Sequence, residues 1–210
     1  KAAPTDRRRP RLPFPPTRMT DIPRPVPDDT MLLCVDMQPR FVAAVAQGDD
    51  VRRRCEFAVA AALGVGLPVA FTEQVPEKLG GTAPELLALA PAAPVWGKST
   101  FSLLADERIR AALADRRVRH VMLCGIETPV CVYQSAIDAL ADGMHVTVLS
   151  DAVGARRADD ARVCLEALAR AGAHVLPAET VFYALLRDVA HPFFRDYTRL
   201  VRRHHEAAPA

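Results

Sequence analysis

Short apolar runs and longer helical patterns alternate along the chain from about residue 30 onward. The first apolar run, at 31–35, reads Met-Leu-Leu-Cys-Val and is followed at once by Asp36. Its shortness and its lack of polar positions are typical of a strand that is buried on both faces. Similar runs predict further strands at 68–71, 94–96, 120–124, 145–149 and 173–176. Helices are predicted at 51–64, 105–114, 129–140 and 159–170, and from about 178 and about 192 onward.

This alternation predicts the fold class. A strand, a crossover helix and a second parallel strand form a right-handed unit, and repeated units give a sheet with helices on both faces. We therefore predict an α/β fold, a three-layer α/β/α sandwich with a six-stranded parallel Rossmann-like sheet. In such sheets the functional site lies beyond the carboxyl ends of the strands. Residues that directly follow strands are thus the first candidates for chemistry.

The first 29 residues differ in character from the rest. They are rich in proline and arginine and show no apolar period, so we predict a flexible arm at 1–29 and one globular domain at 30–210. The arm has seven Lys or Arg and four Asp or Glu, a net charge of +3. The whole chain has a charge of +2, which leaves −1 for the domain. Such a domain gives no electrostatic reason to expect nucleic acid or a membrane as a partner.

The cysteines favour a reducing compartment. Their number, five, is odd, and they show no Cys-x-x-Cys or Cys/His metal spacing. Cys34 and Cys124 lie within apolar runs, where cysteine usually behaves as a small hydrophobic residue. The sequence contains no stretch of roughly 20 apolar residues and no apolar core of a secretory signal near residue 1. We therefore expect a soluble cytoplasmic protein.

Three reactive side chains follow predicted strands. Asp36 ends the first strand, Lys98 follows the third, and Cys131 lies just beyond the fourth. Because the carboxyl ends of parallel strands share one edge of a sheet, we expect these side chains to converge.

Each of the three residues also has a purely structural interpretation. Cys131, near the start of a predicted helix, is either a buried structural cysteine or a nucleophile whose thiol pKa is lowered by unpaired N–H groups and the helix dipole. Asp36 is either a cap for the following turn or a base that accepts the thiol proton. Lys98 is either a solvated loop lysine or a cation that fixes Asp36 and favours the thiolate.

Three stretches of the sequence resemble a known family. LCVDMQ at 33–38, KSTFS at 98–102 and GIETPVCV at 125–132 are similar to the three signature blocks of isochorismatase-like cysteine hydrolases. TEQVPEKLG at 72–80 and VAHPF at 189–193 resemble the branch called isochorismatase domain-containing proteins. Any one block is weak evidence, whereas three in the right order are specific. The resemblance runs from about residue 31 to 202 and implies that the domain at 30–210 is an isochorismatase-like hydrolase domain.

The resemblance also implies roles for individual residues. Asp36 matches the general base of the family, Lys98 its triad lysine and Cys131 its nucleophile. The family has a cis peptide bond in this turn, here between Ile126 and Glu127, with an all-trans turn as the plainer alternative. The backbone N–H groups of Glu127 and Cys131 would then form an oxyanion hole. Two aromatic residues are candidates for substrate binding, although such residues are often simply core: Phe41 and Phe101.

The sequence differs from related enzymes in two features, and these limit which of their properties the resemblance implies for this chain. Related nicotinamidases bind zinc through an Asp-x-His pair after the second strand, but residues 72–77 contain no histidine. We therefore predict no catalytic metal and no cofactor. True isochorismatases often lack the nucleophilic cysteine, so the presence of Cys131 favours amide or acyl hydrolysis over vinyl-ether cleavage.

The sequence therefore predicts a cysteine-dependent hydrolase. It would cleave a small amide-type (C–N) or related acyl substrate through a thioester-type intermediate, and the resemblance implies a homo-oligomer. Three alternatives stay open: a vinyl-ether hydrolase, a non-catalytic interaction protein that retains the fold, and a redox protein in which Cys34 or Cys124 approaches Cys131. A nucleotide-binding Rossmann protein is disfavoured because Gly125 is not followed by Gly-x-x-Gly.

Overall fold

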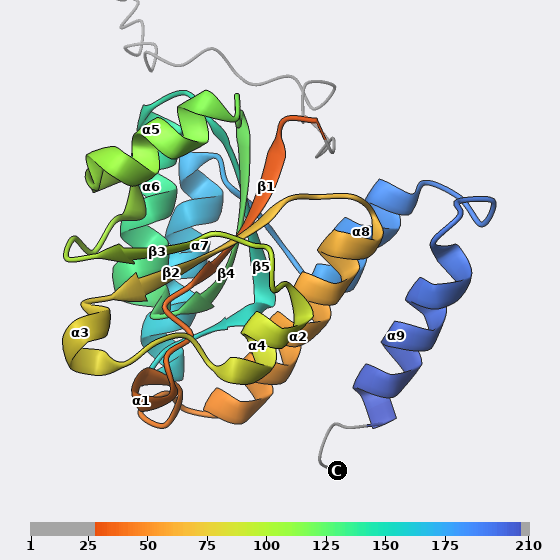
Figure 1. The fold of residues 1–210 in the computed structure, drawn as a ribbon, viewed down its shortest axis with the longest axis horizontal. Coiled ribbons are helices and arrows are strands. Elements are labelled where there is room, and N and C mark those ends of the chain that lie inside the picture. Colours follow the sequence, from red (N-terminus) through yellow and green to blue (C-terminus); the bar gives the residue numbers. More distant parts are fainter. Residues whose placement is uncertain (1–27, 207–210) are drawn as a thin grey trace, which may run out of the picture.

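The structure is a computed structural model that describes residues 28–206, with side chains described up to residue 204. Most of the predicted arm at 1–29 lies outside the described residues, and so does the end of the predicted domain, so these boundaries stay predictions. Asp28 and Asp29 form a turn that leads into the first strand. The described residues form one sheet between two layers of helices (Figure 1).

The sheet confirms the predicted architecture. All neighbouring strands pair in parallel. The described residues form a sheet of six strands in the order β3 (Val95–Lys98), β2 (Val69–Gln74), β1 (Thr30–Val35), β4 (His120–Ile126), β5 (His145–Gly154) and β6 (His174–Leu176). The order reverses between β1 and β4, and parallel α/β sheets bind ligands at such a switch point. The site is therefore expected where β1 and β4 end.

Two apolar layers hold the helices to the sheet. One layer contains residues of α2 (Gly48–Gly64), α4 (Pro84–Leu89), α8 (Ala178–Leu186) and α9 (Phe194–Glu206). The opposite layer contains residues of α5 (Glu107–Asp115), α6 (Tyr133–Ala141) and α7 (Ala158–Ala171). Central strand β1 supplies both layers, because successive side chains of a strand point to opposite faces: Leu32 and Cys34 join the first, Leu33 and Val35 the second. None of the described helices is both long and apolar enough to cross a membrane.

The structure differs from the predicted elements mainly at strand ends. Strand β2 continues through three polar residues, Thr72, Glu73 and Gln74, where the apolar pattern predicted its end. Strand β3 includes Lys98, which was predicted to follow it. Four short elements were not predicted: α1 (Pro39–Val42), α3 (Pro76–Leu79), α4 (Pro84–Leu89) and η2 (Leu103–Ala105). The helix predicted at 129–140 begins with the π-helical turn η3 (Thr128–Val132). Elements α1, α3 and η3 directly follow the carboxyl ends of β1, β2 and β4, where polar residues interrupt the apolar pattern.

Gly125 lets the two central strands meet closely at this edge. Its φ of 110° lies in the region that side chains with a Cβ rarely adopt. A Cβ at this position would lie 2.2 Å from the backbone oxygen of Val35. Glycine is therefore required for β4 to pass the end of β1 and bring residues 126–131 opposite Asp36.

A group of histidines lies at the amino ends of the strands. His120 is the first residue of β4 and only 2% exposed. Its Nε2 lies 2.8 Å from Thr147 Oγ1, and its ring centroid lies 6.0 Å from that of His145 and 6.5 Å from that of His174. Burial, and after it the charges of His145 and His174, lower the pKa of His120 to about 4.

This histidine predicts a loss of stability in mild acid. The pKa in the folded state, about 4, lies below the unfolded value of about 6.5, so the unfolded state binds the proton more tightly. The neutral side chain therefore contributes fully above pH 6.5, and stability falls as the pH drops toward 4, by up to about 3 kcal/mol. Urea unfolding at pH 7.5 and pH 5 should show that the free energy of unfolding falls more between these pH values in the wild type than in His120→Asn. Parallel losses in the two proteins would contradict this assignment.

Candidate active site

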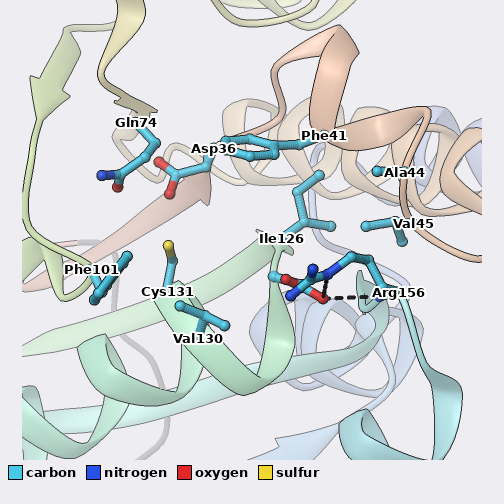
Figure 2. A pocket seen from close by; sticks show the side chains of 11 residues that line it. Asp36, Phe41, Ala44, Val45, Gln74, Phe101, Ile126, Val130, Cys131 and Arg156 are labelled. Atoms are coloured by element: carbon cyan, nitrogen blue, oxygen red, sulfur yellow. Dashed lines mark hydrogen bonds and ion pairs between the residues drawn. The ribbon is translucent and has the colours of Figure 1, made fainter. Parts of the chain in front are cut away.

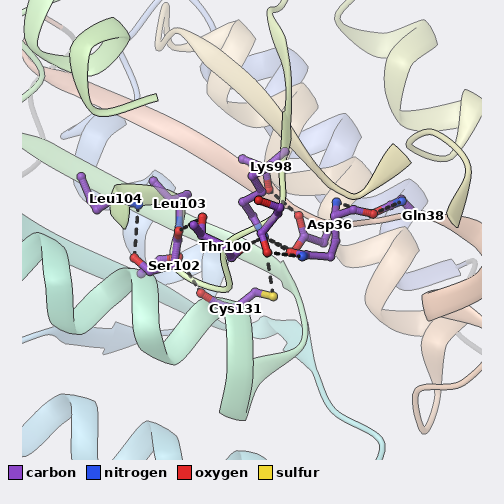
Figure 3. Close-up of polar contacts among 12 residues, drawn as sticks. Asp36, Gln38, Lys98, Thr100, Ser102, Leu103, Leu104 and Cys131 are labelled. Atoms are coloured by element: carbon purple, nitrogen blue, oxygen red, sulfur yellow. Dashed lines mark hydrogen bonds and ion pairs between the residues drawn. The ribbon is translucent and has the colours of Figure 1, made fainter. Parts of the chain in front are cut away.

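The structure brings Asp36, Lys98 and Cys131 into direct contact at the carboxyl edge of the sheet (Figure 3). Lys98 Nζ donates to Asp36 Oδ2 at 2.8 Å and lies 3.7 Å from Cys131 Sγ. The three residues are 1%, 2% and 7% exposed, respectively. Their roles in catalysis remain predictions, but the geometry that those roles need is present.

Asp36 is held by both neighbouring strands. It follows β1 in a left-handed conformation, with a φ of 51°, and its backbone N–H donates to the carbonyl oxygen of Thr72 at 3.0 Å. The Thr72 hydroxyl donates to Asp36 Oδ1 at 2.7 Å, and Lys98 Nζ donates to the other carboxylate oxygen, Oδ2. Each oxygen of the carboxylate therefore has a donor, as a buried charge requires.

Lys98 is a buried cation, so its interpretation as a solvated loop lysine is wrong. Its side chain is fully buried in the ion pair with Asp36. The ammonium also donates to Gln74 Oε1 at 2.6 Å and to the carbonyl oxygen of Thr100 at 3.1 Å. These three oxygens match the three N–H donors of an ammonium, which leaves Cys131 Sγ as an additional neighbour at 3.7 Å.

Cys131 lies in the π-helical turn η3, which precedes α6. Its backbone oxygen accepts a 2.6 Å hydrogen bond from the hydroxyl of Ser135, and that hydroxyl accepts one from the backbone N–H of Leu103 at 3.0 Å. The nucleophile candidate is thus fixed to both α6 and the loop that follows β3.

The thiol pKa of Cys131 does not fall as the sequence predicted. Burial, and after it the negative charge of Asp36, raise the pKa of Cys131 to about 12. Lys98 and a backbone hydrogen bond from Glu127 act in the opposite direction but are weaker. The helix-start argument failed because it omitted burial and a carboxylate that is distant in sequence. The resting sulfur is a thiol.

The turn before Cys131 has the backbone form that the resemblance implies. The peptide bond between Ile126 and Glu127 is cis. The backbone of Glu127 makes a hydrogen bond to the sulfur, so one predicted oxyanion donor lies beside the nucleophile. The second predicted donor is the N–H of Cys131 itself, and the pair stays a prediction.

A cavity of about 460 Å³ opens beside the sulfur. It is of a size typical for small-molecule sites. Asp36, Glu127 and Cys131 line it, and so do both predicted aromatic residues, Phe41 and Phe101 (Figure 2). Phe101 is 61% exposed, so it lies at the open side of the cavity and not in the core.

Sequence reasoning missed several polar residues of this site. Thr72 and Gln74 lie on the polar end of β2, and Gln38 holds that end in place: its amide donates to the carbonyl oxygen of Gln74 at 3.1 Å and accepts from the N–H of Gln74 at 2.7 Å. Arg156 also lines the cavity. For Thr72 and Gln74 the available signal was their position directly after the apolar run of β2, the same signal that identified Asp36.

The other core cysteines lie on the far side of the sheet. Cys34, Cys55 and Cys124 are buried in the layer of α2, whereas Cys131 belongs to the layer of α6. Among the described residues, these three form the one cluster of His, Cys, Asp or Glu close enough to hold a metal ion, with their sulfur atoms within 4.8 Å of one another. The sheet separates them from Cys131, so the geometry does not favour Cys34 or Cys124 as a redox partner of that sulfur.

Curated relatives share most of the described domain. Isochorismatase domain-containing protein 1 of Danio rerio is 35% identical over 177 residues, which cover 84% of this chain and 62% of that protein. The chain therefore spans less than two thirds of this relative. Isochorismatase domain-containing protein 2 of Bos taurus is 35% identical over 182 residues, which cover 85% of this chain and 86% of that protein.

A solved structure and a family model agree with these relatives. The structure described as MAR1 ribonuclease from Caenorhabditis elegans matches with a TM-score of 0.80 at 28% identity, over 90% of this chain and 95% of that one. The model of the isochorismatase domain matches residues 30–180, a range that contains Asp36, Lys98 and Cys131. The chain belongs to the isochorismatase domain family and has the hydrolase fold of that family.

Proposed function

We propose that this protein is a cysteine-dependent hydrolase that cleaves a small amide-type (C–N) or related acyl substrate. The observation that carries the proposal is the buried contact of Lys98 with both Asp36 and Cys131, directly beside a cavity. A structural ion pair alone does not require a thiol at its side or an opening to solvent. Family membership supports hydrolysis, and the reactive sulfur supports a covalent route.

The first half of the reaction forms a thioester. Asp36 accepts the proton of Cys131 while the sulfur bonds to the carbonyl carbon of the substrate. The electron pair of the C=O bond moves to oxygen, which the N–H groups of Glu127 and Cys131 stabilise. The C–N bond then breaks, and the nitrogen takes the proton from Asp36. An amine or ammonia leaves, and the acyl group stays on sulfur.

The second half restores the enzyme. Water attacks the thioester carbon while Asp36 accepts one of its protons. The C–S bond breaks, the sulfur takes the proton back from Asp36, and the carboxylic acid leaves. The ammonium of Lys98, 2.8 Å from Asp36 Oδ2 and 3.7 Å from the sulfur, stabilises the negative charge on whichever group holds it.

A small-molecule substrate fits this site better than a polymer. The cavity of about 460 Å³ is lined mainly by apolar side chains, while nucleic-acid sites are usually basic. We therefore propose a small substrate, although the C. elegans structure is described as a ribonuclease. We also propose that the protein acts in the cytoplasm as a homo-oligomer, as its sequence and the resemblance suggest.

Replacement of the nucleophile tests the covalent route. In a screen of amides, ureides and isochorismate, Cys131→Ala should lose at least about 10³-fold in turnover, because no other group replaces the sulfur. Circular dichroism should show that the variant is folded. Cys164→Ala is the matched control, since Cys164 is also a free cysteine but lies on α7, away from the cavity.

Mass spectrometry completes this test. The wild type, quenched during turnover, should gain the mass of the acyl group on the peptide that contains Cys131. Full activity of Cys131→Ala on an amide would rule out the covalent route. Retained activity on isochorismate alone would instead favour vinyl-ether cleavage.

The ion pair predicts strong coupling in stability. Lys98→Met leaves the Asp36 carboxylate buried without its cation, which should destabilise the fold by roughly 3–5 kcal/mol. Adding Asp36→Asn removes the unpaired charge, so the double variant should be more stable than Lys98→Met alone. Urea unfolding of the wild type, both single variants and the double variant measures this coupling. Simple additivity of the two single effects would show that the pair does not act as a unit.

A further inference from the structure

Three cysteines of the core meet at one point, on the side of the sheet opposite Cys131. Cys34 comes from β1, Cys55 from α2 and Cys124 from β4. Their sulfur atoms all lie within 4.8 Å of one another, and each residue is 0% exposed. A metal–sulfur bond is about 2.3 Å long, so the sulfur atoms of a three-coordinate site lie about 4 Å apart. The spacing of this cluster is therefore close to that of a site with three sulfur ligands.

The backbone brings these side chains together. Cys34 and Cys124 are direct partners in the parallel pairing of β1 with β4, and both contribute to the layer of α2. The register of β4 against β5 shifts beside Cys124. In the irregular part of β5, the carbonyl oxygen of Ala152 accepts a hydrogen bond from the thiol of Cys55 at 3.3 Å. A thiol is a weak donor, so a ligand that binds the sulfur more strongly can replace this contact.

A packing role explains the burial of these cysteines but not their convergence. Free cysteine behaves as a small hydrophobic residue, and burial alone would allow it anywhere in the apolar layer. Three of the five cysteines of the chain instead come from three separate elements and face one another. Groups of thiol ligands are the arrangement that soft ions select in proteins. The geometry therefore points to a ligand that forms bonds to sulfur.

The apolar surroundings determine which charge the ion carries. The layer around the cluster consists of hydrophobic side chains. Asp36, which follows Cys34 closely in the chain, is already a buried negative charge and is paired with Lys98. Three thiolates on a monovalent or divalent ion would add a net negative charge to this layer, and an uncompensated buried charge is very costly. A trivalent ion with three thiolates is neutral. Arsenic(III) is such an ion, and its hydrated form, arsenous acid, is small and uncharged near neutral pH.

We propose that Cys34, Cys55 and Cys124 form a binding site for arsenic(III), which enters as arsenous acid. Each of the three As–O bonds breaks as an As–S bond forms, and each thiol proton leaves with a hydroxyl group as water. The products are one neutral arsenic atom on three sulfur atoms and three water molecules. Arsenic and sulfur keep their oxidation states, and no net charge enters the core. The site lies across the sheet from Cys131 and does not depend on the proposed hydrolysis.

A double variant isolates the cluster without altering it. Cys131→Ala combined with Cys164→Ala leaves the three cluster cysteines as the only cysteines of the chain. The wild type and this variant are reduced with a phosphine and incubated with excess arsenite until the amount of bound arsenic is constant. Incubation has to be long, because buried sulfur atoms become accessible only through local opening of the fold. Free arsenite is then removed by gel filtration.

X-ray absorption at the arsenic K-edge identifies the ligands. The double variant should hold one arsenic per chain, with three sulfur neighbours and no oxygen neighbour. Cys34→Ala, Cys55→Ala and Cys124→Ala, each added to the double variant, should weaken arsenite binding at least about 10²-fold, because the last As–S bond forms within one already bound complex. Circular dichroism shows whether each variant is folded. The spectrum of the double variant decides the question even where a cluster variant does not fold.

Three results would overturn the proposal. The first is a folded double variant that retains no arsenic, or whose arsenic has oxygen neighbours and fewer than three sulfur neighbours. The second is full arsenite binding by a folded variant that lacks one cluster cysteine. The third is binding of cadmium but not of arsenite by the double variant, which would show that the core accepts the charge of a divalent ion. Loss of the proposed hydrolase activity is a separate result, because arsenite binding is measured without substrate.

Discussion

One buried ammonium contacts two acidic groups, and the rest of the site follows from that constraint. Lys98 Nζ lies 2.8 Å from Asp36 Oδ2 and 3.7 Å from Cys131 Sγ, and all three residues are buried. Charge interactions are stronger away from bulk water, so a single cation at this point stabilises one negative charge well and two poorly. Asp36 raises the pKa of the thiol, and in the resting state the proton stays on sulfur. Transfer of that proton to Asp36 moves the negative charge without taking it away from Lys98.

The fold creates this contact from strands that are not all adjacent. β2 lies between β1 and β3, so Lys98 reaches Asp36 past the end of β2. That strand supplies Gln74, which accepts from the ammonium, and Thr72, which donates to the carboxylate. Strand β4 arrives from the other side, beyond the switch point, and its close approach at Gly125 brings the turn with Cys131 opposite Asp36. The cavity opens where these loops meet, as expected for parallel α/β sheets.

The sequence predicted those features that depend on one strand or helix at a time. The six strands follow from apolar runs, and Asp36 was identifiable because it directly follows a buried run, at the edge of the sheet where a site is expected. The polar end of β2 was missed for a related reason: Thr72 and Gln74 break the apolar pattern, yet they stay in the strand because their side chains bind partners on β1 and β3.

Properties that depend on contacts between distant parts of the chain could not be predicted from the sequence. The position of Cys131 at a helix start predicted a lowered thiol pKa. Burial and the charge of Asp36 raise the pKa instead. Arg156 enters the cavity through an ion pair with Glu127, which is 29 residues away in the chain, and no local pattern indicates that pair. The resemblance to a family compensated in part, because it implied the cis peptide bond at Glu127 that the structure contains.

The protonation state of the resting sulfur tests the account most directly. Infrared difference spectra between the wild type and Cys131→Ser at pH 8 isolate the S–H stretch of this residue from those of the other four cysteines. The account predicts an S–H band for Cys131, because burial and the Asp36 carboxylate hold the pKa of the thiol at about 12. Absence of that band in the folded wild type would mean that the sulfur is already a thiolate, and it would contradict the assignment of Asp36 as the group that accepts its proton.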